Sequence, residues 1–87
     1  MQVERIPRAG VVERRALGRA VRELRARRWL SQEALGFRSG LHRNYVGALE
    51  RGDMNPTFGT LLRVRRGLDL PLSEVLAVYE RHLRDGR

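Results

Sequence analysis

The stretch that decides the fold runs from Ser31 to Gly52 and reads SQEALGFRSGLHRNYVGALERG. Ser31 is a good helix N-cap, and Glu33 in the first turn is favoured by the helix dipole. Gly40 supplies the positive φ of a tight turn, and Gly52 ends the helix that follows. We therefore expect one helix to end near residue 38 and the next to span about residues 42–51. This is the build of a helix-turn-helix, which lays its second helix in the major groove of DNA.

Three further helices are predicted around this pair by hydrophobic periodicity. Thr57 can cap one of them, and residues 69–71 break the chain before the last. The expected ranges are about residues 12–28, 57–68 and 72–84. No strand alternation of useful length is present, so we expect an all-α fold of five helices.

One domain, residues 12–84, is what a chain of 87 residues can support. We expect residues 1–11 to form a flexible basic arm and residues 85–87 a short tail. Arg5 and Arg8 in that arm could enter a minor groove, or the arm could simply be disordered.

The charge balance points to a polyanionic partner. Formal net charge is +8, and all 18 Lys+Arg positions are Arg. Such a balance is typical of proteins that bind nucleic acid or an acidic membrane surface. Exclusive use of Arg can also reflect a GC-rich coding sequence, although Arg is the better bidentate partner for phosphate and guanine.

Several classes of function are disfavoured by what the composition lacks. The chain has no Cys, which excludes disulfides and thiolate metal sites and fits a reducing cytoplasm. It has only two His, and no set of residues resembles a catalytic centre or a cofactor cradle. No apolar run approaches the roughly 18 residues of a membrane span. We therefore expect no enzyme, no metal and no cofactor, and a cytoplasmic protein associated with the nucleoid.

A helix in the major groove needs an apolar inner face, a polar outer face and a rim that binds phosphate. Leu41, Val46 and Leu49 suit the inner face of the 42–51 helix. Gly47 either lets the helix backbone approach the bases or is simply a weak helix former. Each polar candidate could instead be a solvated surface residue. The residues expected to contact DNA are Gln32, His42, Arg43, Asn44, Tyr45, Gly47 and Arg51.

A family resemblance rests on the same residues. Residues from about 17 to 76 resemble the Cro/C1-type helix-turn-helix domain of the XRE family, a five-helix, lambda-repressor-like DNA-binding fold. Within that family the chain is most similar to stand-alone restriction–modification controller proteins. The matching positions are Gln32, Leu35, Gly40, Val46, Leu49, Glu50, Gly52 and Pro56.

The resemblance implies a structural role for Arg25 and Glu50. In such domains an Arg and a Glu at these positions form a partly buried ion pair, which sets the angle of the recognition helix. Phe37 stands where the family commonly has a polar residue, so we expect it to be exposed or to meet a partner. The other positions that depart from the pattern are Gly36, Arg65, Gly67 and Pro71.

The apolar face of the last expected helix is wider than one small core needs. We expect part of it to form a two-fold dimer interface, unless all of it packs within the chain. The residues concerned are Val75, Leu76, Tyr79 and Leu83.

Together these features predict a homodimeric, sequence-specific DNA-binding transcriptional regulator, a repressor or autoregulator of a palindromic operator. Its half-sites would lie about 10 bp, or a multiple of that, apart. A toxin or RNA polymerase could be a protein partner. The main alternative is the antitoxin of a toxin–antitoxin pair, which binds a toxin and its own promoter. A charge-driven, non-specific binder of RNA or membrane is a weaker rival, because charge alone requires no helix-turn-helix pattern.

Overall fold

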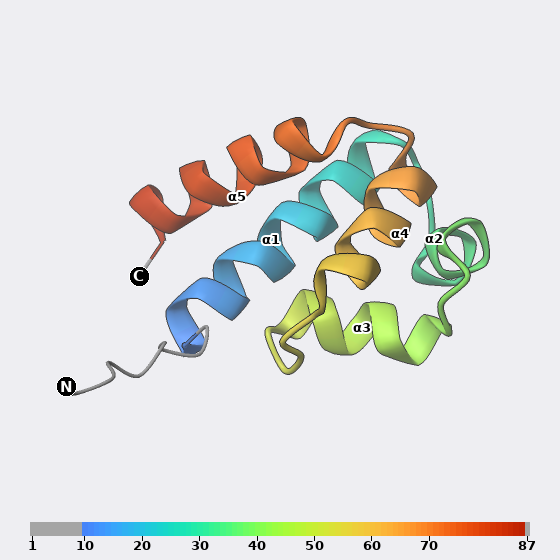
Figure 1. The fold of residues 1–87 in the computed structure, drawn as a ribbon, viewed down its shortest axis with the longest axis horizontal. Helices are drawn as coiled ribbons and strands as arrows, with labels where there is room; N and C mark the ends of the chain where they lie inside the picture. Colours follow the sequence, from blue (N-terminus) through green and yellow to red (C-terminus); the bar gives the residue numbers. More distant parts are fainter. Residues whose placement is uncertain (1–9, 87) are drawn as a thin grey trace, which may run out of the picture.

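The computed structural model describes residues 10–86, which form five helices and no strand (Figure 1). The predicted all-α fold is confirmed. The first helix begins and ends one residue earlier than predicted, and the last helix extends one residue beyond its predicted end. Arg5 and Arg8 lie outside the described residues. The helices are α1 (Val11–Arg27), α2 (Gln32–Ser39), α3 (Arg43–Arg51), α4 (Phe58–Leu68) and α5 (Leu72–Asp85).

Local capping groups set the ends of the three short helices. The Ser31 hydroxyl accepts a hydrogen bond from the Ala34 amide at 2.9 Å, and the Thr57 hydroxyl caps α4 in the same way. Gly40 and Gly52 follow α2 and α3 with φ of 70° and 81°. The turn of the motif is therefore specified by residues within it.

The core is built around α1, which crosses the centre of the molecule (Figure 1). Helix α5 packs along one side of α1, and α3 packs against it on the other side. Helix α2 packs against both α3 and α4. Every helix contributes to one buried cluster, which contains Ala20, Val21, Leu24, Leu35, Val46, Leu49, Val64, Leu68, Val75 and Val78.

Three glycines allow neighbouring segments to approach closely. A Cβ on Gly18 would lie 2.4 Å from the Glu50 carbonyl oxygen, so α1 and α3 touch backbone to backbone. A Cβ on Gly67 would lie 2.0 Å from the Ser39 hydroxyl, and one on Gly36 would lie 2.5 Å from the Leu41 carbonyl. The departures from the family pattern at Gly36 and Gly67 thus accompany very close packing around the turn.

The other departures lie at or near the surface. Phe37 is 89% exposed, as expected. Arg65 is half-buried on α4. Pro71 is the N-cap of α5 and makes no side-chain capping bond, but its carbonyl accepts from the Glu74 amide at 3.0 Å.

Several arginines hold the fold together rather than offering free charge. Their guanidinium groups donate to backbone carbonyls at or near the ends of helices, where the helix dipole favours a cation. A part of the positive charge is therefore structural. These bonds run from Arg14 to Gly52, Arg25 to Leu30, Arg28 to Asp69, Arg38 to Gly67 and Arg63 to Gly40.

Candidate nucleic-acid interface

Helix α3 lies at the lower edge of the molecule in Figure 1 and packs against α1 and α2. Val46 and Leu49 are buried on its inner side. His42, Arg43 and Asn44 are exposed at its N-terminal end, and Tyr45 is half-buried against the core. His42, Arg43 and Asn44 thus share one exposed end of a well-supported helix, whereas Arg51 lies at its other end and Gln32 on α2.

The side chain of Glu50 ties α3 to α1. Its two carboxylate oxygens accept from Nε and Nη2 of Arg25 at 2.6 and 2.9 Å, in a bidentate pair. The side chains of Arg25 and Glu50 are only 15% and 3% exposed. Hydrogen bonding to Glu50 raises the pKa of the Arg25 guanidinium, against the opposing effect of burial. The pair implied by the family resemblance is therefore formed, and it fixes the C-terminal half of α3 on α1.

Gln32 extends this arrangement to the surface. Its amide nitrogen donates to Glu50 Oε1 at 3.0 Å, while the residue itself is exposed at the start of α2. An amide nitrogen carries two protons, so one bond to Glu50 leaves a second donor for another acceptor. The expected contact of Gln32 with DNA is compatible with this geometry.

Gly47 is not exposed, although its place beside the polar residues of the outer face of α3 predicts an exposed position; its contact with DNA stays a prediction. The residue is buried. A Cβ at this position would lie 3.2 Å from Arg51 Nη1 and 3.4 Å from Gln32 Oε1, because both side chains lie across it. Its small size makes room for these two polar side chains on the outer face of α3.

Both arginines of α3 have carboxylate partners. Arg43 Nη1 lies 3.1 Å from Glu33 Oε2, and Arg51 Nε lies 3.0 Å from Asp53 Oδ2. All four side chains are more than half exposed. Exposed pairs of this kind contribute only about 0.2–1 kcal/mol each to stability.

His42 has a structural role that the sequence left open. Its Nδ1 accepts from the Asn44 amide at 3.0 Å, so His42 is the N-cap of α3 and lies just before its first residue. In the neutral ring with Nδ1 as acceptor, the proton is on Nε2. The Nε2–H donor is then available on an exposed side chain.

The four residues of α5 predicted to form a dimer interface differ in how deeply they are buried. Val75 is buried in the chain's own core, so its expected role at a dimer interface was wrong. Leu76, Tyr79 and Leu83 are half-buried. Burial raises the pKa of the Tyr79 hydroxyl, and the carboxylates of Glu13 and Glu80 raise it further.

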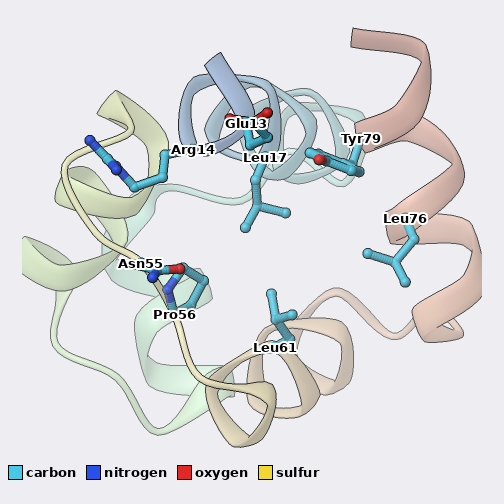
Figure 2. A pocket seen from close by; sticks show the side chains of 8 residues that line it. All are labelled: Glu13, Arg14, Leu17, Asn55, Pro56, Leu61, Leu76 and Tyr79. Carbon is cyan, nitrogen blue, oxygen red and sulfur yellow. The ribbon is translucent and has the colours of Figure 1, made fainter. Parts of the chain in front are cut away.

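Leu76 and Tyr79 line an open, mostly apolar pocket of about 190 Å³ between α1, α4 and α5. Figure 2 shows Leu17, Leu61 and Leu76 pointing toward one another into this hollow, with the Tyr79 ring beside them. Asn55 and Pro56 close it from the segment between α3 and α4 (Figure 2).

An ionic cluster that the sequence did not reveal joins α1 to α5. Glu23 accepts from Arg81, pairs with Arg27, and has His82 Nε2 at 2.7 Å. The hydrogen bond from Arg81 lowers the pKa of Glu23 to about 2, helped by His82 and opposed by burial. Arg81 lies 58 residues from Glu23 in the chain, so the contact could not be predicted from residue spacing within one helix.

Comparison with known proteins agrees with this geometry. The helix-turn-helix family model HTH_3 matches residues 21–75. The chain is 40% identical over 60 residues to the control protein C.SmaI of Serratia marcescens, covering 69% of this chain and 71% of that protein.

Two solved structures are also similar to this chain. The restriction–modification controller protein C.AhdI of Aeromonas hydrophila is 43% identical with a TM-score of 0.69, over 70% of this chain and 92% of that one. The clp gene regulator ClgR of Corynebacterium glutamicum is 29% identical with a TM-score of 0.75, over 79% and 90%.

Within residues 10–86, no helix is long and apolar enough to cross a membrane. The family match, residues 21–75, includes both helices of the helix-turn-helix. Within that motif, α3 has an exposed polar end and a buried inner side. The chain therefore belongs to the XRE-type helix-turn-helix family of DNA-binding transcriptional regulators, and it is similar to restriction–modification controller proteins.

Proposed function

We propose that this protein is a sequence-specific transcriptional regulator that binds a palindromic operator as a homodimer and represses transcription, its own gene included. It acts by binding, without catalysis, on DNA in the cytoplasm. The observation that carries the proposal is the end of α3, where His42, Arg43 and Asn44 are exposed above a buried support. Such an arrangement holds a few polar side chains rigidly at base edges.

Each polar residue has a contact suited to its chemistry. The guanidinium of Arg43 can donate twice to O6 and N7 of guanine, and the amide of Asn44 can pair with adenine. Gln32, at the N-terminus of α2, suits a phosphate, as do the Tyr45 hydroxyl and Arg51. With six to ten phosphates contacted by the dimer, affinity falls by roughly 10³–10⁵ between 50 and 200 mM salt.

The dimer would use the face around the apolar pocket. Leu76 and Tyr79 at its rim, with Leu83 further along α5, remain half-buried in the single chain. A second copy related by a two-fold axis would bury them and set two α3 helices on one face of the duplex. Leu76→Asp, which places a charge in that surface, is expected to give monomers in sedimentation equilibrium.

Selection of bound sites from random duplex DNA tests the proposal, with Arg43→Ala and Asn44→Ala measured in parallel. The proposal predicts an enriched inverted repeat that each variant loses or relaxes at defined positions. Glu74→Gln, on the exposed surface of α5, is the control and should select the same repeat. No enriched sequence, with binding that disappears as salt rises, would contradict the proposal.

A second candidate is favoured by Phe37, which is 89% exposed on α2. A large exposed aromatic side chain is typical of protein interaction sites. The candidate is an antitoxin that binds a toxin, or a regulator that contacts RNA polymerase, through this residue. It predicts that Phe37→Ser keeps operator affinity but abolishes binding to the toxin encoded beside the gene, or abolishes activation by polymerase. Unchanged behaviour in both assays would remove this candidate.

A further inference from the structure

We infer that Glu33 is a positioning residue that determines specificity, acting through Arg43 to favour base contacts over phosphate contacts. The inference rests on the proposed function, because it assigns a role within sequence-specific recognition. It concerns an acidic side chain on a surface that meets a polyanion, where a carboxylate is otherwise unfavourable.

The geometry places this carboxylate at the junction of the two helices of the motif. Glu33 lies in the first turn of α2, and Arg43 is the first residue of α3. Glu33 Oε2 accepts from Arg43 Nη1 at 3.1 Å, while the side chains stay 73% and 61% exposed. The pair is therefore on the outer surface of the helix-turn-helix.

The bond leaves Arg43 able to bind a base. A guanidinium has five N–H donors in a planar fork, and Glu33 uses one Nη1 donor. The Nη2 and Nε donors remain free for the two acceptors of a guanine edge. Holding one nitrogen also reduces the number of rotamers that the long Arg43 side chain samples, so less conformational entropy is lost when it meets the correct base.

A phosphate contact has different consequences for the pair. A phosphate that binds Arg43 closely brings a negative charge next to the Glu33 carboxylate, so it must displace the carboxylate or suffer its repulsion. Two other carboxylates lie near α3. Glu50 is paired with Arg25 and is almost fully buried, and Asp53 is paired with Arg51 at the far end of the helix from Arg43. Glu33 therefore weakens binding to non-specific DNA, where Arg43 would contact phosphate, more than it weakens binding to the operator.

Glu33 also lies near the positive end of the α2 dipole, which is the simpler explanation for an acid in the first turn. That role concerns the stability of the helix and makes no distinction between operator and non-specific DNA. A measurement of specificity, with unfolding followed separately, distinguishes the two roles.

The experiment compares Glu33→Gln with the wild type on the selected operator and on a scrambled duplex of equal length and composition. Because the proposed dimer carries two copies of Glu33, we expect the Kd for scrambled DNA to fall by up to about 25-fold, which is about fivefold for each exposed ion pair. The slope of log affinity against log salt concentration on scrambled DNA should steepen by about 1.8, which corresponds to one added phosphate contact in each subunit. Operator affinity should change much less, so the ratio of the two affinities falls. Glu74→Gln makes the same charge change on α5 and should leave the ratio unaltered.

A double-mutant cycle tests whether Glu33 acts through Arg43. In an Arg43→Met background, Glu33→Gln should leave the affinity for scrambled DNA unchanged. An equal gain with and without Arg43 would show simple repulsion and overturn the inference, as would an unchanged ratio in the single variant. If the wild type selects no operator, the proposed function fails. A wild type that prefers its operator while Glu33→Gln keeps the same ratio refutes only the role of Glu33.

Discussion

Helices α3 and α5 both pack on α1, but they are attached to it by different means. Helix α3 touches α1 backbone to backbone at Gly18 and is fixed by the bidentate pair of Arg25 with Glu50. Helix α5 has two buried residues, Val75 and Val78, both in its first half. Beyond them the α1–α5 contact includes the partly exposed cluster around Glu23.

This difference in attachment matches the function proposed for each helix, which is base recognition for α3 and dimer formation for α5. A helix that reads bases must keep its orientation within narrow limits, which close packing and a buried ion pair provide. A helix that forms a dimer interface needs apolar side chains that the core of its own chain does not fully bury. Helix α5 has three such side chains, Leu76, Tyr79 and Leu83, which are half-buried. Changes at the α1–α3 contact should therefore have larger effects than changes at the α1–α5 contact.

The largest effect is expected from Glu50→Ala. It leaves the Arg25 guanidinium without its partner in a mostly buried site, at a cost of about 3–5 kcal/mol in the free energy of unfolding. For a domain of this size the thermal midpoint should fall by at least about 12 °C. Calorimetry measures it, with the exposed Glu80→Ala as control. A midpoint within about 2 °C of the wild type would contradict the structural role of the pair.

A smaller loss is expected from Gly18→Ala. The added methyl group would lie 2.4 Å from a carbonyl oxygen of α3, so the two helices must separate. Overpacking outweighs the gain in helix propensity, with a net loss of about 1–2 kcal/mol in the free energy of unfolding. In Gly59→Ala, the new Cβ would lie 3.7 Å from the Thr57 hydroxyl, an ordinary van der Waals distance, so this control should gain about 0.5 kcal/mol in the free energy of unfolding. Equal effects of the two variants in urea unfolding would show that α1 and α3 are not closely packed.

The smallest effect is expected from Glu23→Gln, and it depends on pH. The pKa of Glu23 is lowered from about 4.5 to about 2 in the folded protein. Its contribution to stability is therefore present above about pH 4.5 and is lost as the pH falls toward 2. Since the cluster is partly exposed, the wild type should exceed the variant by no more than about 1 kcal/mol at pH 6. Urea titrations across this range should show the two converging in acid, and a constant difference would contradict the assigned cause.

Local signals made the boundaries of the helices predictable from sequence. Ser31 and Thr57 offer capping hydroxyls, and Gly40 and Gly52 permit a positive φ, so each acts through its immediate neighbours. The orientation of Phe37 away from the core was also predictable, because its position in a short helix places it opposite Leu35 and Ser39.

Contacts between distant parts of the chain were not predictable in the same way. Gly47 has an exposed position by helical period, but the side chains of Gln32 and Arg51 cover it. Val75 lies on the same apolar stripe as its neighbours, and only the packing of α5 on α1 shows that it belongs to the core. Trp29, exposed with φ of 58° in the turn after α1, has a backbone conformation that its residue type does not suggest.

Native-state amide hydrogen exchange tests the central contrast most directly, because it measures the free energy of opening for each helix in the unmodified protein. We expect the amides of Val46 and Leu49 in α3 to exchange only through global unfolding. The amides of α5 beyond Val78 should exchange through local opening, at a distinctly lower free energy. Exchange of α3 through local opening, or protection of the end of α5 equal to that of α3, would contradict the view that α3 is attached to α1 more firmly than α5 is.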